Sequence, residues 1–441
     1  MNSGFFSRSV TVLLVSVLSS CQTPSIDSLS DFFPKGDKSR AAQPGQISGV
    51  TPGDAEQPLD LNRRTFVILQ VDGGGIMGIT PAVVLRHLEE GIQSGRPNCQ
   101  ESEIKDFLSV VSGTSTGAII AGSVAAGIPA ARIEKYYTDT GVKLFQSTGR
   151  YPLGVFPFFR PKFKREAFQH ELYKMLVDDS DCHCATQTLR DLSDGPLLSI
   201  AAYDLCSKRT HFFRTRGTDG GPIPSVMPDI QLADAISASA LSAALYFGKL
   251  TAKPVVWDHV AEDGSVSLIQ GAVYQDGGQG TQNCTMALVA LEALARDWCN
   301  RLSPKDQVVL ISLGCGNDYT PVSYNKASRA SGTAQVLSFL RNQARQESAL
   351  LQWRGLRTLA AANPNFKLFR FDYHAPQGSS AFSARLADKY RQAGEEIAHR
   401  KEFTRLISDL CKVRSFGKYD DRPATQPERR QYSTKPMLKA L

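Results

Sequence analysis

Residues 65–78 read TFVILQVDGGGIMG, an apolar run followed by Asp72 and three consecutive glycines. The run is rich in β-branched residues and lacks polar alternation, which is typical of a strand covered on both faces of a parallel sheet. After the glycines, Thr80 can cap a helix whose first position is Pro81, because proline fits the first turn of a helix. The segment therefore predicts a strand, a glycine turn and a helix in succession.

The same alternation of strand-like runs and helical periodicity continues along the chain. Further strands are predicted at 107–112, 197–203, 308–313 and 367–372, and further helices at 231–244, 285–298 and 381–410. Strands that alternate with helices form a parallel sheet with right-handed crossovers. The predicted fold class is therefore α/β, with a mainly parallel central sheet flanked by helices, and sites on such sheets lie at the carboxyl ends of the strands.

The composition is that of a soluble globular protein, because 42% of the residues are apolar and 21% are charged. A chain of 441 residues can bury a large core without disulfides or a metal. The net charge of +7 is mild, and no basic segment is interleaved with aromatics, which argues against a nucleic-acid partner. Residues 412–441 are expected to form a basic, disordered tail, with weak attraction to anionic lipid as the alternative.

The N-terminal residues differ from the rest of the chain. An apolar run at 10–18 is too short to span a bilayer, and it ends in Leu18-Ser19-Ser20-Cys21. This ending resembles the lipobox of bacterial lipoproteins. The resemblance implies that a signal peptide, 1–20, is removed and that acyl chains are attached to Cys21, whereas a secretory signal cut nearby is the alternative.

The segment after this signal is expected to tether a folded domain to a membrane. Residues 21–63 are rich in Pro, Gly, Ser and Asp and lack periodicity, which is typical of a flexible linker. Gln22 stands where an Asp would retain a lipoprotein at the inner membrane of a Gram-negative cell. The expected location is therefore the bacterial cell envelope, at the outer membrane or its periplasmic face.

The segment Gly113-Thr114-Ser115-Thr116-Gly117 fits the pattern G-x-S-x-G. It lies between a predicted strand and a predicted helix, where the nucleophile elbow of a hydrolase must lie. Gly113 and Gly117 would let the flanking segments approach closely, and the amide dipoles of the helix would favour developing negative charge. Ser115 is therefore a candidate nucleophile.

The glycine run after the first strand is a candidate anion site, because glycines let backbone N–H groups converge on a negative charge. A nucleotide-binding loop is the alternative, since Gly73, Gly75 and Gly78 satisfy G-x-G-x-x-G. That function needs an acidic residue after a second strand, whereas Glu89 and Glu90 lie inside the following helix. The glycine run therefore predicts an oxyanion site rather than a nucleotide site.

A third motif is Tyr274-Gln275-Asp276-Gly277-Gly278, in which an acidic residue follows a short apolar segment. Asp276, flanked by Gly277 and Gly278, could reach the serine directly. By itself, without the other two motifs, this segment predicts a two-residue hairpin turn.

Taken together, these three motifs resemble the patatin-like phospholipase family. They occur in the family's order, and 233–247 and 311–316 resemble its Ala/Ser-rich helix and its S-L-G-T-G strand. The resemblance covers 64–372 and implies a three-layer patatin-like fold over a catalytic domain at 64–411.

The resemblance also implies a Ser–Asp dyad without histidine. Ser115 would attack the ester carbonyl of a lipid or phospholipid, and Asp276 would act as the general base. Backbone amides of Gly73, Gly74 and Gly75 would hold the oxyanion, without cofactor, metal or obligatory protein partner. Two departures from the family pattern stand out: Met77 replaces an Arg or Lys, and only Asn283 matches the segment that follows D-G-G.

Several alternatives stay open at this level. His374 follows a predicted strand and completes the order Ser, acid, His of a conventional triad. A non-catalytic lipid-binding lipoprotein is the other possibility. Cys182-His183-Cys184 has no second half with ligand spacing, so no metal is expected. The aromatic segment 151–161 would flank an acyl pocket or pack beneath a loop, and disulfide pairings cannot be assigned.

Overall fold

A computed structural model of the chain describes residues 58–95, 103–147, 162–177, 186–192, 194–215, 230–243, 246–247, 250–251, 256–260, 266–270, 272–279, 281–295, 302–303, 305–317, 324, 328–329, 331–332 and 346–415. The predicted signal segment with Cys21, the tether up to residue 57, the aromatic segment, Cys182-His183-Cys184 and the tail beyond residue 415 lie outside these residues. Within the described part of the chain, no helix is both long and apolar enough to cross a membrane.

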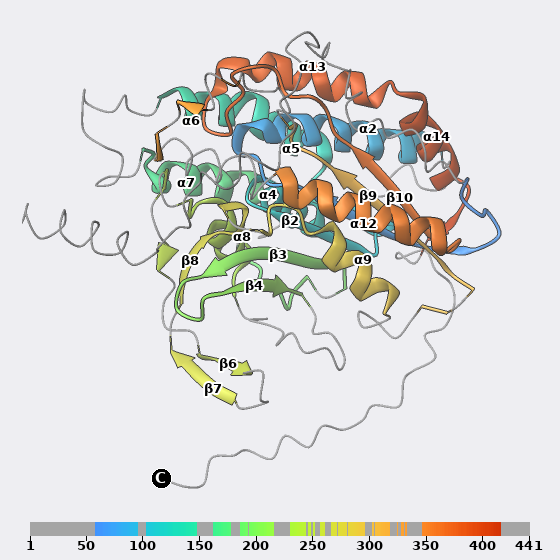
Figure 1. The fold of residues 1–441 in the computed structure, drawn as a ribbon, viewed down its shortest axis with the longest axis horizontal. Coiled ribbons are helices and arrows are strands. Elements are labelled where there is room, and N and C mark those ends of the chain that lie inside the picture. Colours follow the sequence, from blue (N-terminus) through green and yellow to red (C-terminus); the bar gives the residue numbers. More distant parts are fainter. Residues whose placement is uncertain are drawn as a thin grey trace, which may run out of the picture. The chain divides into compact units, whose positions relative to one another are not determined.

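A central sheet runs through the domain, with the strand order β10-β9-β1-β2-β3-β8-β5 (Figure 1). The five strands from β10 to β3 are parallel to their neighbours, whereas β8 and β4 pair antiparallel with β3, and β5 pairs antiparallel with β8. The predicted mainly parallel sheet is confirmed. The strands are β1 Arg64–Val71, β2 Val110–Thr114, β3 Leu197–Asp204, β4 Arg209–Arg214, β5 Leu250–Thr251, β8 Val273–Asp276, β9 Gln307–Leu313, β10 Phe366–Phe371 and β11 Arg414–Ser415, which pairs with β1. A separate hairpin joins β6 Val256–Val260 and β7 Val266–Gln270.

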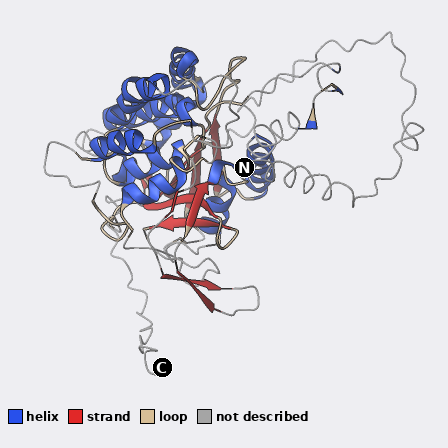
Figure 2. Cartoon of the chain, turned by 90° about the vertical axis from the view of Figure 1, so that its left-hand side faces the viewer, coloured by secondary structure: helices blue, strands red, loops and turns tan. Residues whose placement is uncertain are grey.

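Helices cover both faces of this sheet. The α-helices are α2 Ile79–Gly95, α3 Ile104–Phe107, α4 Thr116–Ala125, α5 Ala130–Lys135, α6 Val142–Ser147, α7 Arg165–Leu176, α8 Leu232–Ala240, α9 Met286–Leu294, α12 Ser348–Ala362, α13 Ala387–Ala398 and α14 Lys401–Leu410. Short 3₁₀ turns occupy η3 Gly75–Gly78, η6 Gly277–Gln279 and η8 Ala384–Leu386, and a π-helical segment occupies η5 Tyr136–Gly141. In Figure 2 the helices pack against the strands, and Figure 1 shows α13 lying along α2.

Strand β1 shows how the core is divided between the two faces. Val67, Leu69 and Val71 join the larger apolar cluster, which includes residues of α2, α4, α5, α8, α13 and α14. Phe66 and Ile68 join a second cluster with α9 and α12 on the other face. Because successive side chains of a strand point to opposite faces, a strand that is apolar throughout needs both covers. The three-layer α/β architecture is therefore confirmed.

The predicted starts of one strand and one helix were wrong. Strand β2 begins at Val110 rather than 107, because Phe107 is the last residue of the short helix α3, which buries its side chain in the core. An apolar run alone does not distinguish a helix from a strand. Helix α2 begins at Ile79, directly after η3, so Pro81 lies inside its first turn. The Thr80 hydroxyl does not cap the helix but donates to the carbonyl of Tyr390 in α13, at 2.7 Å.

The predicted helices also differ in extent. The segment predicted at 231–244 is helical only over Leu232–Ala240, and the segment predicted at 285–298 is helical over Met286–Leu294. The helix predicted at 381–410 is divided into η8, α13 and α14, with a break at His399 and Arg400. The strands at 197–203, 308–313 and 367–372 are found within one residue of their predicted bounds.

Candidate active site

Ser115 lies between the end of β2 and the start of α4. Its backbone has φ 55° and ψ −121°, a conformation that L-residues other than glycine rarely adopt and that costs about 1–3 kcal/mol. The N–H of Ser115 donates to the hydroxyl of Ser239 in α8, at 2.8 Å, and that hydroxyl donates to the carbonyl of Ala201 in β3, at 2.6 Å. Contacts from two other elements thus hold the strained serine in place.

The glycines on either side of Ser115 allow the strand and the helix to meet. A Cβ on Gly113 would lie 2.1 Å from the carbonyl oxygen of Gly117, and a Cβ on Gly117 would lie 2.2 Å from that of Val71. Both distances are far below van der Waals contact, so no side chain fits at either position. The prediction that Gly113 and Gly117 allow close approach is confirmed.

The sheet brings Asp276 to the serine, 161 positions away in the chain. The hydroxyl of Ser115 donates to Oδ2 of Asp276 at 2.7 Å. Oδ1 accepts from the N–H of Gly278, also at 2.7 Å. The two side chains lie at the surface of the core, with Ser115 7% exposed and Asp276 4% exposed. A buried carboxylate that accepts two hydrogen bonds can remain ionised, as a general base must.

The register of β3 explains this meeting. Thr114 at the end of β2 pairs with Ala201 of β3, and the adjacent residue, Ala202, pairs with Asp276 of β8 along the same edge, because β4 occupies the other edge of β3. After Asp276 the chain enters the 3₁₀ turn η6 at Gly277 instead of a hairpin. The hairpin interpretation of D-G-G was therefore wrong.

Two backbone amides of the glycine loop remain available to a ligand. Gly73 donates its N–H to the carbonyl of Asn283 at 3.0 Å, and Ile76 donates to the carbonyl of Ala381 at 2.8 Å. Among the described residues, no acceptor lies on the N–H of Gly74 or Gly75. The three glycines predicted as oxyanion donors therefore differ in the structure: the carbonyl of Asn283 occupies the amide of Gly73, whereas Gly74 and Gly75 retain theirs.

The glycine loop lies next to the serine. A Cβ on Gly73 would come within 3.1 Å of the Cβ of Ser115, and Gly75 and Ser115 line the same cavity. Gly75 has φ +56°, and a Cβ there would lie 1.9 Å from the carbonyl oxygen of Ala381. A side chain at this position would force the backbone of the loop to shift. The arrangement offers donors for a developing oxyanion beside a hydroxyl and its acceptor.

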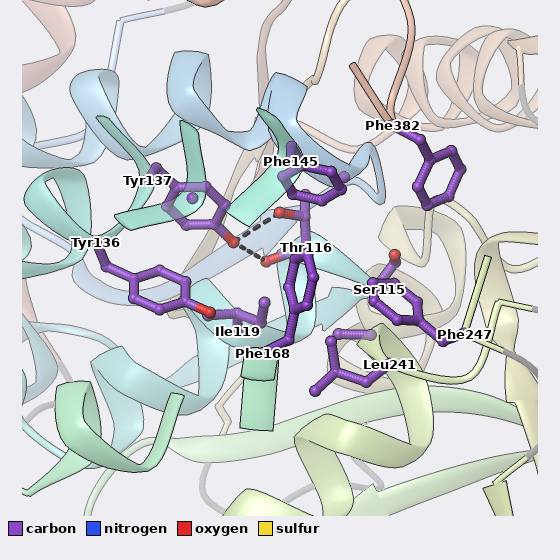
Figure 3. A pocket seen from close by; sticks show the side chains of 13 residues that line it. Ser115, Thr116, Ile119, Tyr136, Tyr137, Phe145, Phe168, Leu241, Phe247 and Phe382 are labelled. Carbon is purple, nitrogen blue, oxygen red and sulfur yellow. Dashed lines mark hydrogen bonds between the residues drawn. The ribbon is translucent and has the colours of Figure 1, made fainter. Parts of the chain in front are cut away.

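A narrow apolar cavity opens beside Ser115 (Figure 3). Its volume is about 30 Å³, which is room for about two water molecules. Four phenylalanine rings line it, from Phe145 in α6, Phe168 in α7, Phe247 and Phe382, together with the rings of Tyr136 and Tyr137. These rings also contact one another, with Phe145 and Phe168 centroids 5.1 Å apart and Phe168 and Phe247 centroids 4.9 Å apart.

The lining of the cavity includes a pair of polar groups that are hydrogen-bonded to each other. The hydroxyl of Tyr137 donates to the carbonyl of Thr116 at 2.9 Å and accepts from the Thr116 hydroxyl at 2.6 Å, as Figure 3 shows. Burial raises the pKa of Tyr137 well above its usual value, so the phenol stays protonated. The cavity thus offers apolar walls rather than a second titrating group.

His374 does not lie between the serine and the aspartate. In a triad an imidazole separates these two side chains, whereas here the hydroxyl and the carboxylate are in direct contact at 2.7 Å. His374 is exposed, and its backbone bridges to Asn317 beyond the end of β9. The geometry favours the dyad over the triad.

The nucleotide alternative loses its acidic partner in the structure. Glu89 is buried in α2 and accepts backbone N–H groups of Ile104, at 3.3 Å, and of Ala130, at 2.8 Å. Burial raises the pKa of this carboxyl despite the two bonds. The Glu89 carboxylate therefore connects α2 to α3 and α5 and is not available to bind the ribose of a nucleotide. Met77, the departure in the glycine loop, is buried in the larger apolar cluster.

Several residues of the site were not found from the sequence. Ser239, Ala381 and Arg370 reach it from distant elements, and their roles depend on tertiary contacts. The match of Asn283 to the family pattern was the one signal that pointed to such a contact. Its Nδ2 donates to the carbonyl of Gly73 at 3.2 Å, which completes a two-way link to the loop. Among the described residues, no group of three His, Cys, Asp or Glu could hold a metal.

Comparisons with known proteins agree with the motifs. The sequence profile of the family described as patatin-like phospholipase matches residues 69–289. Patatin-T5 of Solanum tuberosum is 27% identical over 181 residues, which cover 35% of this chain and 46% of that protein. Probable inactive patatin-3-Kuras 1 of the same species is 26% identical over 202 residues, 40% of this chain and 53% of that protein. The chain thus spans about half the length of these curated relatives.

Two solved structures are similar over a larger part of the chain. The crystal structure of VipD from Legionella pneumophila aligns over 76% of this chain and 66% of VipD, with a TM-score of 0.30 and 12% identity. The crystal structure of the type III effector protein ExoU aligns over 77% of this chain and 53% of ExoU, with a TM-score of 0.28 and 13% identity.

Proposed function

The chain belongs to the patatin-like phospholipase family, and on this basis we propose that it hydrolyses acyl esters of lipids through a Ser115–Asp276 dyad. One observation carries the proposal: the 2.7 Å hydrogen bond from the Ser115 hydroxyl to Asp276, beside the two glycine amides that have no acceptor among the described residues. A nucleophile in contact with a base, next to donors for an oxyanion, is the minimal equipment for acyl transfer.

The proposed reaction has two halves. Oδ2 of Asp276 takes the proton of Ser115 while Oγ attacks the ester carbonyl, and the oxyanion accepts from the N–H groups of Gly74 and Gly75. The protonated Asp276 then returns the proton to the leaving alcohol, which leaves an acyl-enzyme. Water, deprotonated by Asp276, attacks this ester and releases the carboxylic acid, and the proton returns to Oγ. Each oxyanion donor is typically worth about 3 kcal/mol of barrier.

The apolar cavity beside Ser115 is the proposed site for the acyl chain. Its walls are aromatic and aliphatic, which suits a hydrocarbon tail and excludes a charged headgroup from this side. At about 30 Å³ the cavity is too small for a long chain, so the surrounding rings must move apart as one enters. The proposed substrate is a lipid or phospholipid ester.

Hydrolysis of p-nitrophenyl acyl esters and of phospholipid vesicles tests the proposal. The wild-type protein should release acid from both, and Ser115→Ala should lower kcat by about 10⁴-fold or more. His374→Ala should keep most of the activity, because the imidazole is not part of the dyad. Equal turnover by wild type and Ser115→Ala would overturn the proposal.

We also propose that the protein is exported and anchored through acyl chains on Cys21. The lipobox-like sequence before this residue supports the proposal, and an acylated N-terminus would hold the domain beside its substrate. Metabolic labelling with palmitate should mark the wild-type protein and not Cys21→Ser. Label retained by the variant would contradict the anchor and leave the proposed hydrolysis unaffected.

A further inference from the structure

A row of polar side chains crosses the sheet directly below the glycine loop. The strand register aligns Gln70 of β1 with Ser112 of β2 and with Ser312 of β9, and Ser312 with Arg370 of β10. Earlier residues of the same strands, on the same face, belong to the apolar cluster with α9 and α12. The face therefore changes from apolar to polar at the carboxyl ends of the strands, where the candidate active site lies.

Arg370 links Ser312 in this row to two carboxylates. Its Nη2 donates to Asp72 at 2.6 Å and to Asp372 at 2.8 Å. Its Nη1 donates to Asp72 at 3.3 Å and to the hydroxyl of Ser312 at 2.7 Å. The guanidinium thus bridges β1, β9 and the end of β10 with a planar fork that lysine cannot reproduce.

Burial makes this cluster a strong electrostatic unit. Arg370 is 5% exposed and Asp72 is 3% exposed. Burial lowers the pKa of Arg370, but the adjacent Asp72 and Asp372 carboxylates raise it by a larger amount, so the pKa lies well above its usual value. An Asp72 carboxylate without this cation would place an uncompensated negative charge at the base of a site that must accept an oxyanion.

Asp72 connects the cluster to the glycine loop, because it directly precedes Gly73. Its N–H donates to the carbonyl of Leu313 at 3.0 Å, and its side chain also accepts from Nε2 of Gln70 at 3.0 Å. The next two anchors along the chain are Asn283 on Gly73 and Ala381 on Ile76. The amides of Gly74 and Gly75 lie between these fixed points, so their direction depends on them.

We propose that Arg370 is a positioning residue, which holds the Gly74 and Gly75 amides in oxyanion geometry through its fork on Asp72. Arg370 lies beyond the 69–289 region matched by the family profile, and it touches neither the serine nor the cavity. The inference rests on the proposed function, because it assigns a role to the same oxyanion site.

Steady-state hydrolysis of a p-nitrophenyl ester by Arg370→Lys tests this role. The variant keeps the charge but loses the fork, so kcat should fall by about 10²-fold, as for loss or misplacement of one oxyanion donor. KM should change less than about threefold, because the amides stabilise the transition state more than the bound ester. Asp72→Asn should also lower kcat, and the double variant should lose no more than Arg370→Lys alone, since both changes break one link.

Arg214→Lys provides the matched control. Arg214 is also buried in the sheet and pairs with Glu292 at 2.8 and 3.2 Å, but it lies on β4 rather than beside the glycine loop. The Arg214→Lys variant should have a lower melting temperature than the wild type but an unchanged kcat. Wild-type kcat in folded Arg370→Lys, or an equal fall in Arg214→Lys, would overturn the inference. If Arg370→Lys fails to fold, Asp72→Asn replaces it as the test, and wild-type kcat in that variant would overturn the inference in the same way. Absence of Ser115-dependent turnover in the wild type would instead overturn the proposed function.

Discussion

The two glycine-containing turns of the site follow neighbouring parallel strands, yet they are fixed in different ways. In the turn after β2, Gly113 and Gly117 are pressed against other backbone, and the strain is concentrated in Ser115. In the loop after β1, side chains and carbonyls from distant elements hold the residues on either side of the two oxyanion amides. The first turn is fixed mainly by close packing of backbone against backbone, whereas the second is fixed mainly by hydrogen bonds and ion pairs from distant elements. Damage to the first should therefore appear in folding, and damage to the second in catalysis.

The largest effect is expected for Gly117→Ala. Its Cβ would lie 2.2 Å from the carbonyl of Val71, at the end of a central strand that cannot move aside. We expect the free energy of unfolding to fall by more than about 3 kcal/mol, above the usual range for overpacking, because the clash is with backbone. Thermal and urea unfolding measure this. A variant that melts with the wild type would contradict the packing account of this turn.

The next effect in size is expected for Gly75→Ala. Its Cβ would also meet a carbonyl, that of Ala381, but this residue lies in a partly exposed loop that can yield. The variant should fold, with its amide displaced, and kcat should fall by about 10²-fold, as for loss of one oxyanion donor. Comparison of kcat with the melting temperature gives the answer. A large loss of stability with wild-type kcat would reverse the contrast between the two turns.

Gly355→Ala is the control for both substitutions. Gly355 lies inside α12, and no atom would come within 4 Å of a new Cβ. Alanine is the better helix former, so the variant should be more stable by about 1 kcal/mol, with unchanged kcat. Urea unfolding checks this. Destabilisation of this variant would show that glycine substitutions in this fold cannot be interpreted from backbone clearance alone.

The smallest effect is expected on the outer surface of α2, where Glu395 of α13 contacts His87 at 2.7 Å and Arg86 at 3.0 Å. Burial raises the pKa of Glu395, but His87 and Arg86 lower it by a larger amount, so the pKa lies below the usual 4.5. A lowered carboxyl pKa stabilises the fold above the usual pKa, and this stabilisation is lost as the pH falls through the lowered value.

Glu395→Gln should therefore be less stable than wild type at neutral pH, and the difference should shrink below about pH 4.5. Because the Glu395 side chain is 35% exposed, screening keeps the difference under about 1 kcal/mol. Urea unfolding at pH 7 and pH 3.5 measures it. A stability difference between Glu395→Gln and the wild type that grows on acidification would contradict the lowered pKa of Glu395. A fall in kcat of this variant would show that residues outside the two turns also affect catalysis.

The sequence predicted the turn after β2 better than the loop after β1, for a physical reason. Ser115, Gly113 and Gly117 are close in sequence, and steric limits on the backbone dictate their roles. The meeting of Ser115 and Asp276 followed from motif order and the family resemblance, because no local property of either residue requires it. The parallel sheet was predicted from the apolar runs. Phe107 was wrongly assigned to a strand, because its buried side chain belongs to helix α3.

The loop after β1 could not be predicted to the same depth. Gly73 was expected to offer its amide, but Asn283 occupies it from 210 positions away. Arg370 reaches Asp72 across 298 positions, and only the strand order β10-β9-β1 brings them together. Such contacts depend on the register of the finished sheet, which a single sequence leaves open.

The second-order rate of labelling by a fluorophosphonate tests the central claim, the direct activation of Ser115 by Asp276, most directly. Intact-protein mass spectrometry should find one adduct on the wild type, located at Ser115, and none on Ser115→Ala. Asp276→Asn, which keeps the shape of the side chain, should react at least about 10²-fold more slowly, because the serine has lost its base. Labelling of Asp276→Asn at the wild-type rate, or an adduct on another residue, would contradict the account.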